Sequence, residues 1–196
     1  GYHLDIAPTI NHATCAHGGE LVHDKELREF NPTNPKGYKA LFERRAALIH
    51  TLRMQKALAA EDRAAVEPFP VHGTAKGILR RTVQILKRHR DVHFLEVVEE
   101  IAPISIIITT LAAQSYEYCV KSFVFDSELD VLIATIRLMP HFIDKPVVNG
   151  RRIYVVANET TVGENFAERW NTEPARAAAF YEWHAKALAD FEALPD

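Results

Sequence analysis

The stretch Tyr2-His-Leu-Asp-Ile-Ala-Pro8 decides how the fold is interpreted. Its pattern is typical of a strand, in which alternate side chains face opposite sides of the sheet. Asp5 then stands as a single carboxylate beside apolar neighbours, as an aspartate that holds a metal ion does. Because this strand begins two residues into the chain, we expect its pairing strands and the carboxylates that share its metal to lie elsewhere. The sequence therefore predicts the second half of an enzyme.

The composition is that of an ordinary globular protein with one core: 196 residues, 47% hydrophobic and 25% charged. The longest apolar stretch, 101–113, contains polar residues and is shorter than the roughly 18 to 20 residues that span a bilayer. Cys15 and Cys119 lie far apart, which favours free thiols in a reducing compartment. We therefore expect no signal peptide, no membrane segment and a cytoplasmic location. The net charge of −3 argues against general attraction to nucleic acid.

Periodicity and capping residues predict one strand followed by helices. Apolar residues recur at helical spacing in several segments, which are 35 to about 60, from 74 onward, 126–139 and 174–194. The β-branched run 104–118 fits either a buried strand or a buried helix, and periodicity alone leaves both open. A short strand is predicted over 152–157.

The helix that begins near 74 is strongly basic. At about 100° per residue, Lys76, Arg80 and Lys87 form one stripe, while Arg81 and Arg88 form another. Like charges at such spacing destabilise a helix by a few tenths of a kcal/mol per pair, so acidic neighbours or an anionic ligand must compensate. The pattern predicts either a solvated, ion-paired face or a phosphate-binding face.

A cluster of potential zinc ligands lies near the start of the chain, comprising His12, Cys15, His17 and His23. Imidazole and thiolate are the usual ligands of zinc, but this spacing matches no standard zinc finger. A flexible histidine-rich loop is the favoured alternative, so we assign no metal site there.

Several motifs follow one another in an order that resembles a known family. They are Tyr2-His-Leu-Asp-Ile-Ala-Pro8, Asn34-Pro-Lys-Gly-Tyr38 with Leu41-Phe-Glu-Arg-Arg45, Val83-Gln-Ile-Leu-Lys-Arg-His-Arg-Asp91, Pro103-Ile-Ser-Ile-Ile-Ile-Thr-Thr-Leu111 and Glu164-Asn-Phe-Ala-Glu-Arg-Trp170. Together they resemble the C-terminal half of bacterial cGAS/DncV-like nucleotidyltransferases (CD-NTases), the enzymes of cyclic-oligonucleotide antiphage signalling (CBASS).

The resemblance implies a mainly α fold with a short β segment, the second half of a two-lobed polymerase-β-like nucleotidyltransferase. Residues 1–33 would end the catalytic core and residues 34–196 would form the helical C-terminal lobe. In this family the run 104–118 is helical, so the resemblance favours a helix there.

The resemblance also implies the catalytic chemistry. Asp5 matches the third of three carboxylates that hold Mg²⁺ or Mn²⁺, while the other two come from an acidic pair after a Gly-Ser turn that these 196 residues do not contain. Phosphoryl transfer of this kind uses two metal ions, and one carboxylate does not hold both. We therefore expect this chain to be inactive alone and to need the missing N-terminal lobe, supplied in cis or in trans.

Two further residues match nucleotide-binding positions of the family. Lys87 matches a lysine on the helix that faces the triphosphate, and Ser105 matches a serine that approaches the nucleotide from the base side. Arg88 lies about 100° around the helix from Lys87, with Glu96, Glu99 or Glu100 as potential partners. Asn158 and Asn165 resemble positions near the cleft, but asparagine also caps turns locally.

The function that the resemblance implies is synthesis of a cyclic oligonucleotide from NTPs, ATP among them, in the bacterial cytoplasm. Regulatory CBASS proteins are the expected partners, and neither a membrane nor a DNA template is expected. Two alternatives stay open: a non-catalytic helical module that binds a partner, and a template-independent RNA nucleotidyltransferase. The second should carry a broad basic surface, and the negative net charge speaks against it.

Overall fold

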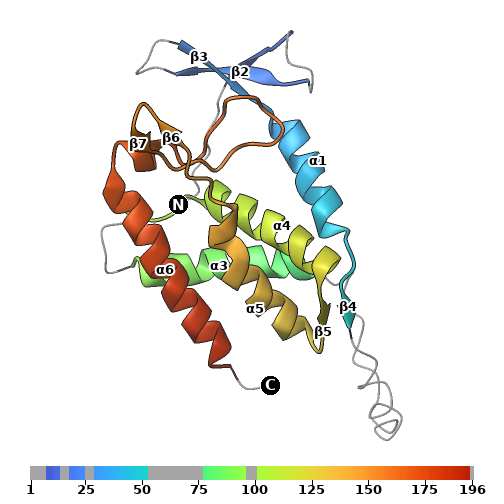
Figure 1. Cartoon of the computed structure of the whole chain (residues 1–196). Coiled ribbons are helices and arrows are strands. Elements are labelled where there is room, and N and C mark those ends of the chain that lie inside the picture. The colour runs from blue at the N-terminus through green and yellow to red at the C-terminus, as the bar shows by residue number, and fades with distance from the viewer. Residues whose placement is uncertain (1–7, 14–17, 25–28, 53–76, 96–100, 195–196) are drawn as a thin grey trace, which may run out of the picture.

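The computed structural model describes residues 8–13, 18–24, 29–52, 77–95 and 101–194. In these residues the fold is mainly α-helical with small sheets, as predicted, and α4 (Ser105–Ser122) packs against three of the other α-helices (Figure 1). The helices are α1 (Pro35–Ala46), α3 (Ile78–His93), α4 (Ser105–Ser122), α5 (Glu128–Leu138) and α6 (Pro174–Glu192), with the 3-10 helices η3 (Met139–Phe142) and η4 (Glu168–Asn171).

A three-stranded antiparallel sheet precedes α1 and lies at the end of the bundle where α1 begins (Figure 1). Its strands are β1 (Thr9–Asn11), β2 (Glu20–Asp24) and β3 (Glu29–Thr33), in that order. The prediction of one strand followed by helices was therefore wrong for this part of the chain. Polar residues in these strands obscured the hydrophobic pattern that would have predicted them. The strands are held together by cross-strand pairs such as Ile10 with Leu21. The predicted strand at 2–8 falls almost wholly outside the described residues.

The first helix is shorter than the predicted 35–60. It starts where expected, because Asn34 Oδ1 accepts a hydrogen bond from the Gly37 amide at 2.8 Å and Pro35 occupies the first turn. It ends at Ala46, and Thr51–Leu52 forms β4, which pairs in parallel with β5 (Val124–Phe125). This pairing with a distant segment replaces the helix that local periodicity predicted.

The ambiguous run 104–118 is helical, as the resemblance implied. It belongs to α4, which contacts α1, α3 and α5, so apolar residues are needed on nearly every side. The hydroxyl groups of Thr109 and Thr110 donate to carbonyls one turn earlier in the same helix, at 2.8 Å each. Ser115 Oγ donates to the Thr135 carbonyl of α5 at 2.6 Å. The hydroxyl groups of Thr109, Thr110 and Ser115 are thus satisfied, whereas Gln114 Oε1 is buried without a hydrogen-bond partner among the described residues.

The C-terminal part was predicted with mixed success. The predicted helix 126–139 is α5 followed by η3, and the predicted C-terminal helix is α6, which buries Phe180, Trp183 and Ala187. The predicted strand 152–157 is reduced to Arg151–Arg152 (β7), paired with Val147–Val148 (β6).

Beyond β7, single bridges such as Asp144 with Val155 continue the pairing. In the part of the chain that the structure describes, no helix has both the length and the hydropathy of a membrane span.

Candidate functional site

Part of the basic face of α3 is ion-paired. Arg80 pairs with Glu43 of α1, and Arg81 pairs with Glu128 of α5 at 2.8 Å. For these two arginines the interpretation as a solvated, paired face is confirmed. Lys76 and the glutamates expected near Arg88 lie outside the described residues, and the Arg88 side chain is exposed.

Lys87 differs from its paired neighbours on α3. Its ammonium has no ion-pair partner within 4.0 Å among the described residues, and its side chain is half-buried. Burial lowers the Lys87 pKa, and the nearby Arg90 guanidinium lowers it further, while Asp91 opposes both effects. Lys87 is thus a cation held in a positive environment, which favours an anionic ligand.

Ser105 is linked to the helix of Lys87 through Arg90. Arg90 Nη1 donates to the Pro103 carbonyl at 2.8 Å and to Ser105 Oγ at 3.1 Å. The same guanidinium donates to Asp91 Oδ1 from Nε at 2.8 Å and from Nη2 at 2.5 Å. The structure therefore connects Ser105, at the start of α4, to α3 through Arg90, which lies three residues after Lys87 on that helix.

A groove of about 470 Å³ opens beside this junction. Its polar residues are Arg90, Asp91 and Ser105, and its apolar wall includes Phe94, Leu95 and Ile104. Its volume is in the range of small-molecule sites, and a mostly apolar wall with a few converging polar groups is typical of them. The arrangement suits a ligand with an apolar face and an anionic or hydrogen-bonding edge.

Sequence reasoning missed Arg90 and Asp91. A signal was present, because these residues follow Lys87 by three and four positions and so share its side of α3. What the pattern did not contain was the contact of Arg90 with Pro103 and Ser105, which is made only when α3 and α4 pack together.

The two asparagines of the C-terminal segment organise their own loops. Asn165 Oδ1 accepts hydrogen bonds from the Val156 and Ala167 amides, each at 2.9 Å. Asn158 Oδ1 accepts from the Thr160 amide at 3.0 Å. These contacts fit the expected local capping.

The described residues support neither the possible zinc cluster near the start of the chain nor the metal site predicted at Asp5. They contain no group of three or more histidine, cysteine or acidic residues that would hold a metal ion. His12 and His23 lie in or beside the sheet, where the His23 ring packs edge-on against Phe30. Cys15, His17 and Asp5 lie outside the described residues, so the assignment of Asp5 to catalysis and metal binding stays a prediction.

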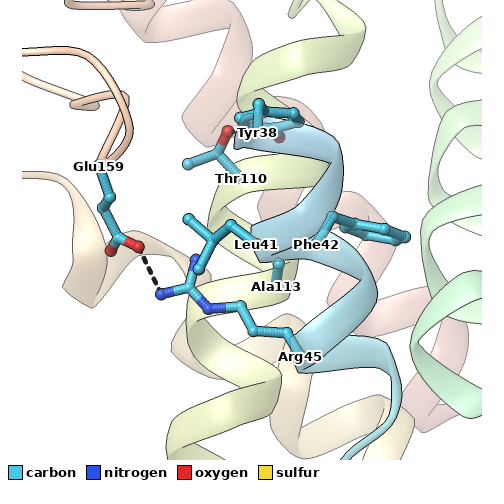
Figure 2. Close-up of a pocket in the computed structure, with 7 residues that line it drawn as sticks. All are labelled: Tyr38, Leu41, Phe42, Arg45, Thr110, Ala113 and Glu159. Atoms are coloured by element: carbon cyan, nitrogen blue, oxygen red, sulfur yellow. Dashed lines mark hydrogen bonds and ion pairs between the residues drawn. The ribbon is translucent and has the colours of Figure 1, made fainter. Parts of the chain in front are cut away.

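A second pocket, between α1, α4 and the segment of Glu159, is structural. Its volume is only about 10 Å³, and Arg45 crosses it to Glu159 while Tyr38 faces Thr110 (Figure 2). Arg45 donates to Glu159 and to Glu117 at 2.6 Å each. A cavity of this size holds about one water molecule, so it is too small for a nucleotide.

Comparisons with known proteins agree with this fold. No family model matches the chain. The chain has the fold of the C-terminal part of a CD-NTase, which confirms the resemblance and the fold class predicted from the sequence.

One solved structure with this fold is the CD-NTase CdnG of Bradyrhizobium diazoefficiens in complex with GTP. It matches with a TM-score of 0.61 over 98% of this chain and 58% of that one, at 19% identity. The chain is also similar to the c-di-GMP synthase of Roseivirga ehrenbergii, with 28% identity over 174 residues, which are 88% of this chain and 42% of the synthase. It thus spans less than half the length of this curated relative.

Proposed function

We propose that this chain is the C-terminal part of an enzyme that makes a cyclic oligonucleotide from NTPs, ATP among them, as a second messenger in bacterial antiphage defence. The observation that carries the proposal is the junction of α3 and α4, where Arg90 links the helix of Lys87 to Ser105 beside a groove of about 470 Å³. The similarity to a c-di-GMP synthase supports the same chemistry.

In this proposal Lys87 and Ser105 bind the nucleotide. The Lys87 ammonium neutralises phosphate charge, and a fixed cation in a partly desolvated position acts more strongly than one in water. Ser105 contacts the nucleotide from the groove at the start of α4. The CD-NTase CdnG was solved with GTP, which supports a nucleotide ligand for this fold.

The proposed catalytic centre belongs to the catalytic core and not to the helical lobe. Residues 1–33 end the catalytic core, residues 34–196 form the helical lobe, and Asp5 binds Mg²⁺ or Mn²⁺, for which a carboxylate is a suitable ligand. These ions would neutralise charge on the reacting phosphates. A single carboxylate does not hold two ions, so the remaining ligands must come from an N-terminal lobe, in cis or in trans.

The setting of the reaction belongs to the same proposal. We expect the enzyme to act in the bacterial cytoplasm without a DNA template, under the control of regulatory CBASS proteins. A nucleotidyltransferase of RNA ends and a purely partner-binding module stay as alternatives.

The first test is to determine the intact mass and N-terminal sequence of the natural polypeptide and to incubate it with Mg²⁺ and the four NTPs. Mass spectrometry of the products distinguishes cyclic oligonucleotides from extended RNA ends. We expect a mass above 22.2 kDa, a Gly-Ser turn with an acidic pair upstream, and a cyclic product. A polypeptide of 22.2 kDa that forms no product, with or without a second chain, would favour the partner-binding module.

A further inference from the structure

The hydrogen-bonding state of Ser105 limits what its hydroxyl group can do. Ser105 Oγ accepts a hydrogen bond from Arg90 Nη1 at 3.1 Å, which occupies one of its two lone pairs. Within the described residues, no protein acceptor receives the hydroxyl proton of Ser105. The hydroxyl group therefore faces the groove with a donor that needs an acceptor.

Arg90 is held in place from several sides. Its guanidinium is bound by the Pro103 carbonyl and by two contacts to Asp91 Oδ1, and only 16% of its side chain is exposed. A planar guanidinium fixed at both ends of its fork makes its remaining contact in one direction. Arg90 thus sets the direction from which the Ser105 oxygen accepts and keeps the hydroxyl proton out of that direction.

The charge of this neighbourhood favours the same kind of ligand atom. Lys87 and Arg90 are cationic, and among the described residues Asp91 is the one carboxylate that acts on Lys87, so the balance of these charges is positive. A hydroxyl group polarised by an adjacent guanidinium is a stronger donor than a free one. Both effects favour an electron-rich acceptor over a donor.

We infer that Arg90 is a positioning residue, which presents the Ser105 hydroxyl as a hydrogen-bond donor and so selects an acceptor atom of the bound nucleotide. The acceptor is either a ring nitrogen of a purine base or a phosphate oxygen. This inference rests on the proposed function and adds to it the polarity of the contact and the residue that sets it.

A double-mutant cycle in the complete natural polypeptide tests the inference, with GTP affinity measured by titration calorimetry. The variants are Ser105→Ala, Arg90→Lys and the double variant; lysine keeps the charge but lacks the planar fork. Each single change should weaken binding about three- to tenfold, the size of one lost hydrogen bond, and the double variant should be no weaker than the weaker single one. Ser105→Thr, which keeps the hydroxyl group, should bind nearly as well as the wild type.

Analogues of the ligand identify the acceptor. If it is the purine N7, 7-deaza-GTP should bind the wild type about three- to tenfold more weakly than GTP and bind Ser105→Ala as well as GTP does. If it is a phosphate oxygen, 7-deaza-GTP should behave as GTP does in both proteins, and the Ser105→Ala penalty should vanish with guanosine.

The outcomes separate this inference from the proposed function. Independent, multiplying losses in the two single variants, with wild-type affinity retained, would overturn the role of Arg90 while leaving nucleotide binding in place. A wild-type protein that binds no nucleotide would overturn the proposed function and the inference with it.

Discussion

Trp183 of α6 donates a hydrogen bond from Nε1 to Nδ1 of His89 on α3, at 3.0 Å. Because Nδ1 accepts here, the neutral His89 ring carries its proton on Nε2, which lies 3.1 Å from Asp190 Oδ2. One imidazole therefore joins two residues of α6 to the helix that carries Lys87. The position of Lys87 depends on this contact as well as on apolar packing.

Trp183→Phe should destabilise the protein by about 1 to 3 kcal/mol, because it removes ring volume from a fully buried position and leaves His89 Nδ1 without its donor. Urea unfolding measures the change. Trp170→Phe is the matched control, since Trp170 is also buried but its Nε1 has no hydrogen-bond partner among the described residues. Equal losses in the two variants would show that the contact with His89 adds no stability.

Arg45→Ala should cost about 2 to 4 kcal/mol of unfolding free energy. Only 8% of the Arg45 side chain is exposed, and its loss leaves Glu117 and Glu159 without their shared cation. The estimate lies below that for a fully buried pair because 38% of Glu159 is exposed. Arg44→Ala, an exposed neighbour on the same helix, should change stability by less than about 0.5 kcal/mol. Similar losses at both positions would rule out a specific role for the Arg45 pairs.

The elements that the sequence predicted well are those whose signals are local. Helix α6 shows its apolar side as Phe180, Trp183 and Ala187, and α1 shows its start as Asn34 followed by proline. The elements that were predicted wrongly depend on partners far away in the sequence. Thr51–Leu52 is a strand only because it pairs with 124–125, and no local pattern records that pairing.

The candidate site likewise combines residues that local motifs predicted with a contact between separate helices that they did not predict. Lys87 and Ser105 came from motifs that resemble a family, and the structure adds a contact between the helices that carry them. Arg90 joins α3 to Ser105 through a contact between the end of one helix and the start of the next, 15 residues apart in sequence. Such a contact is a property of how α3 packs against α4, so neither charge spacing nor hydrophobic periodicity predicts it.

Lys87→Ala in the complete enzyme should lower kcat/KM by about 1 to 3 kcal/mol of transition-state stabilisation, the loss expected for a charge-assisted contact to phosphate. The measurement is steady-state synthesis from NTPs. Arg88→Ala removes the same charge from an exposed neighbour and should have little effect. Wild-type kinetics in the Lys87 variant would remove Lys87 from the phosphate site, and equal losses in both variants would indicate a general effect of charge.

His184 should make stability depend on pH. Burial lowers the pKa of its ring, although the contact of Nε2 with the Ile136 carbonyl at 2.7 Å opposes this effect. The unfolded state, in which the histidine pKa is about 6.5, therefore binds a proton at a pH where the folded state does not. Stability should be unaffected by this group above that pH and should fall as the pH drops below it.

Urea unfolding at pH 7.5 and pH 5.0, with His184→Gln as the comparison, isolates this contribution. The wild type should lose more unfolding free energy than the variant on acidification, since the other titrating groups are common to both proteins. Equal losses would exclude His184 as the source, and a larger loss in the variant would reverse the sign of the proposed shift.

Asp5→Asn should abolish synthesis in the complete enzyme while leaving the thermal midpoint within a few degrees of the wild type. The change removes a negatively charged metal ligand and keeps a side chain of nearly the same shape, so the chemistry is lost without a cavity. Asp144→Asn is the control, because it removes an equal charge from an exposed position and should leave synthesis intact. Synthesis near the wild-type rate in the Asp5 variant would remove Asp5 from the catalytic centre. A large drop in its thermal midpoint would instead assign Asp5 a structural role, since loss of activity would then follow from loss of the fold.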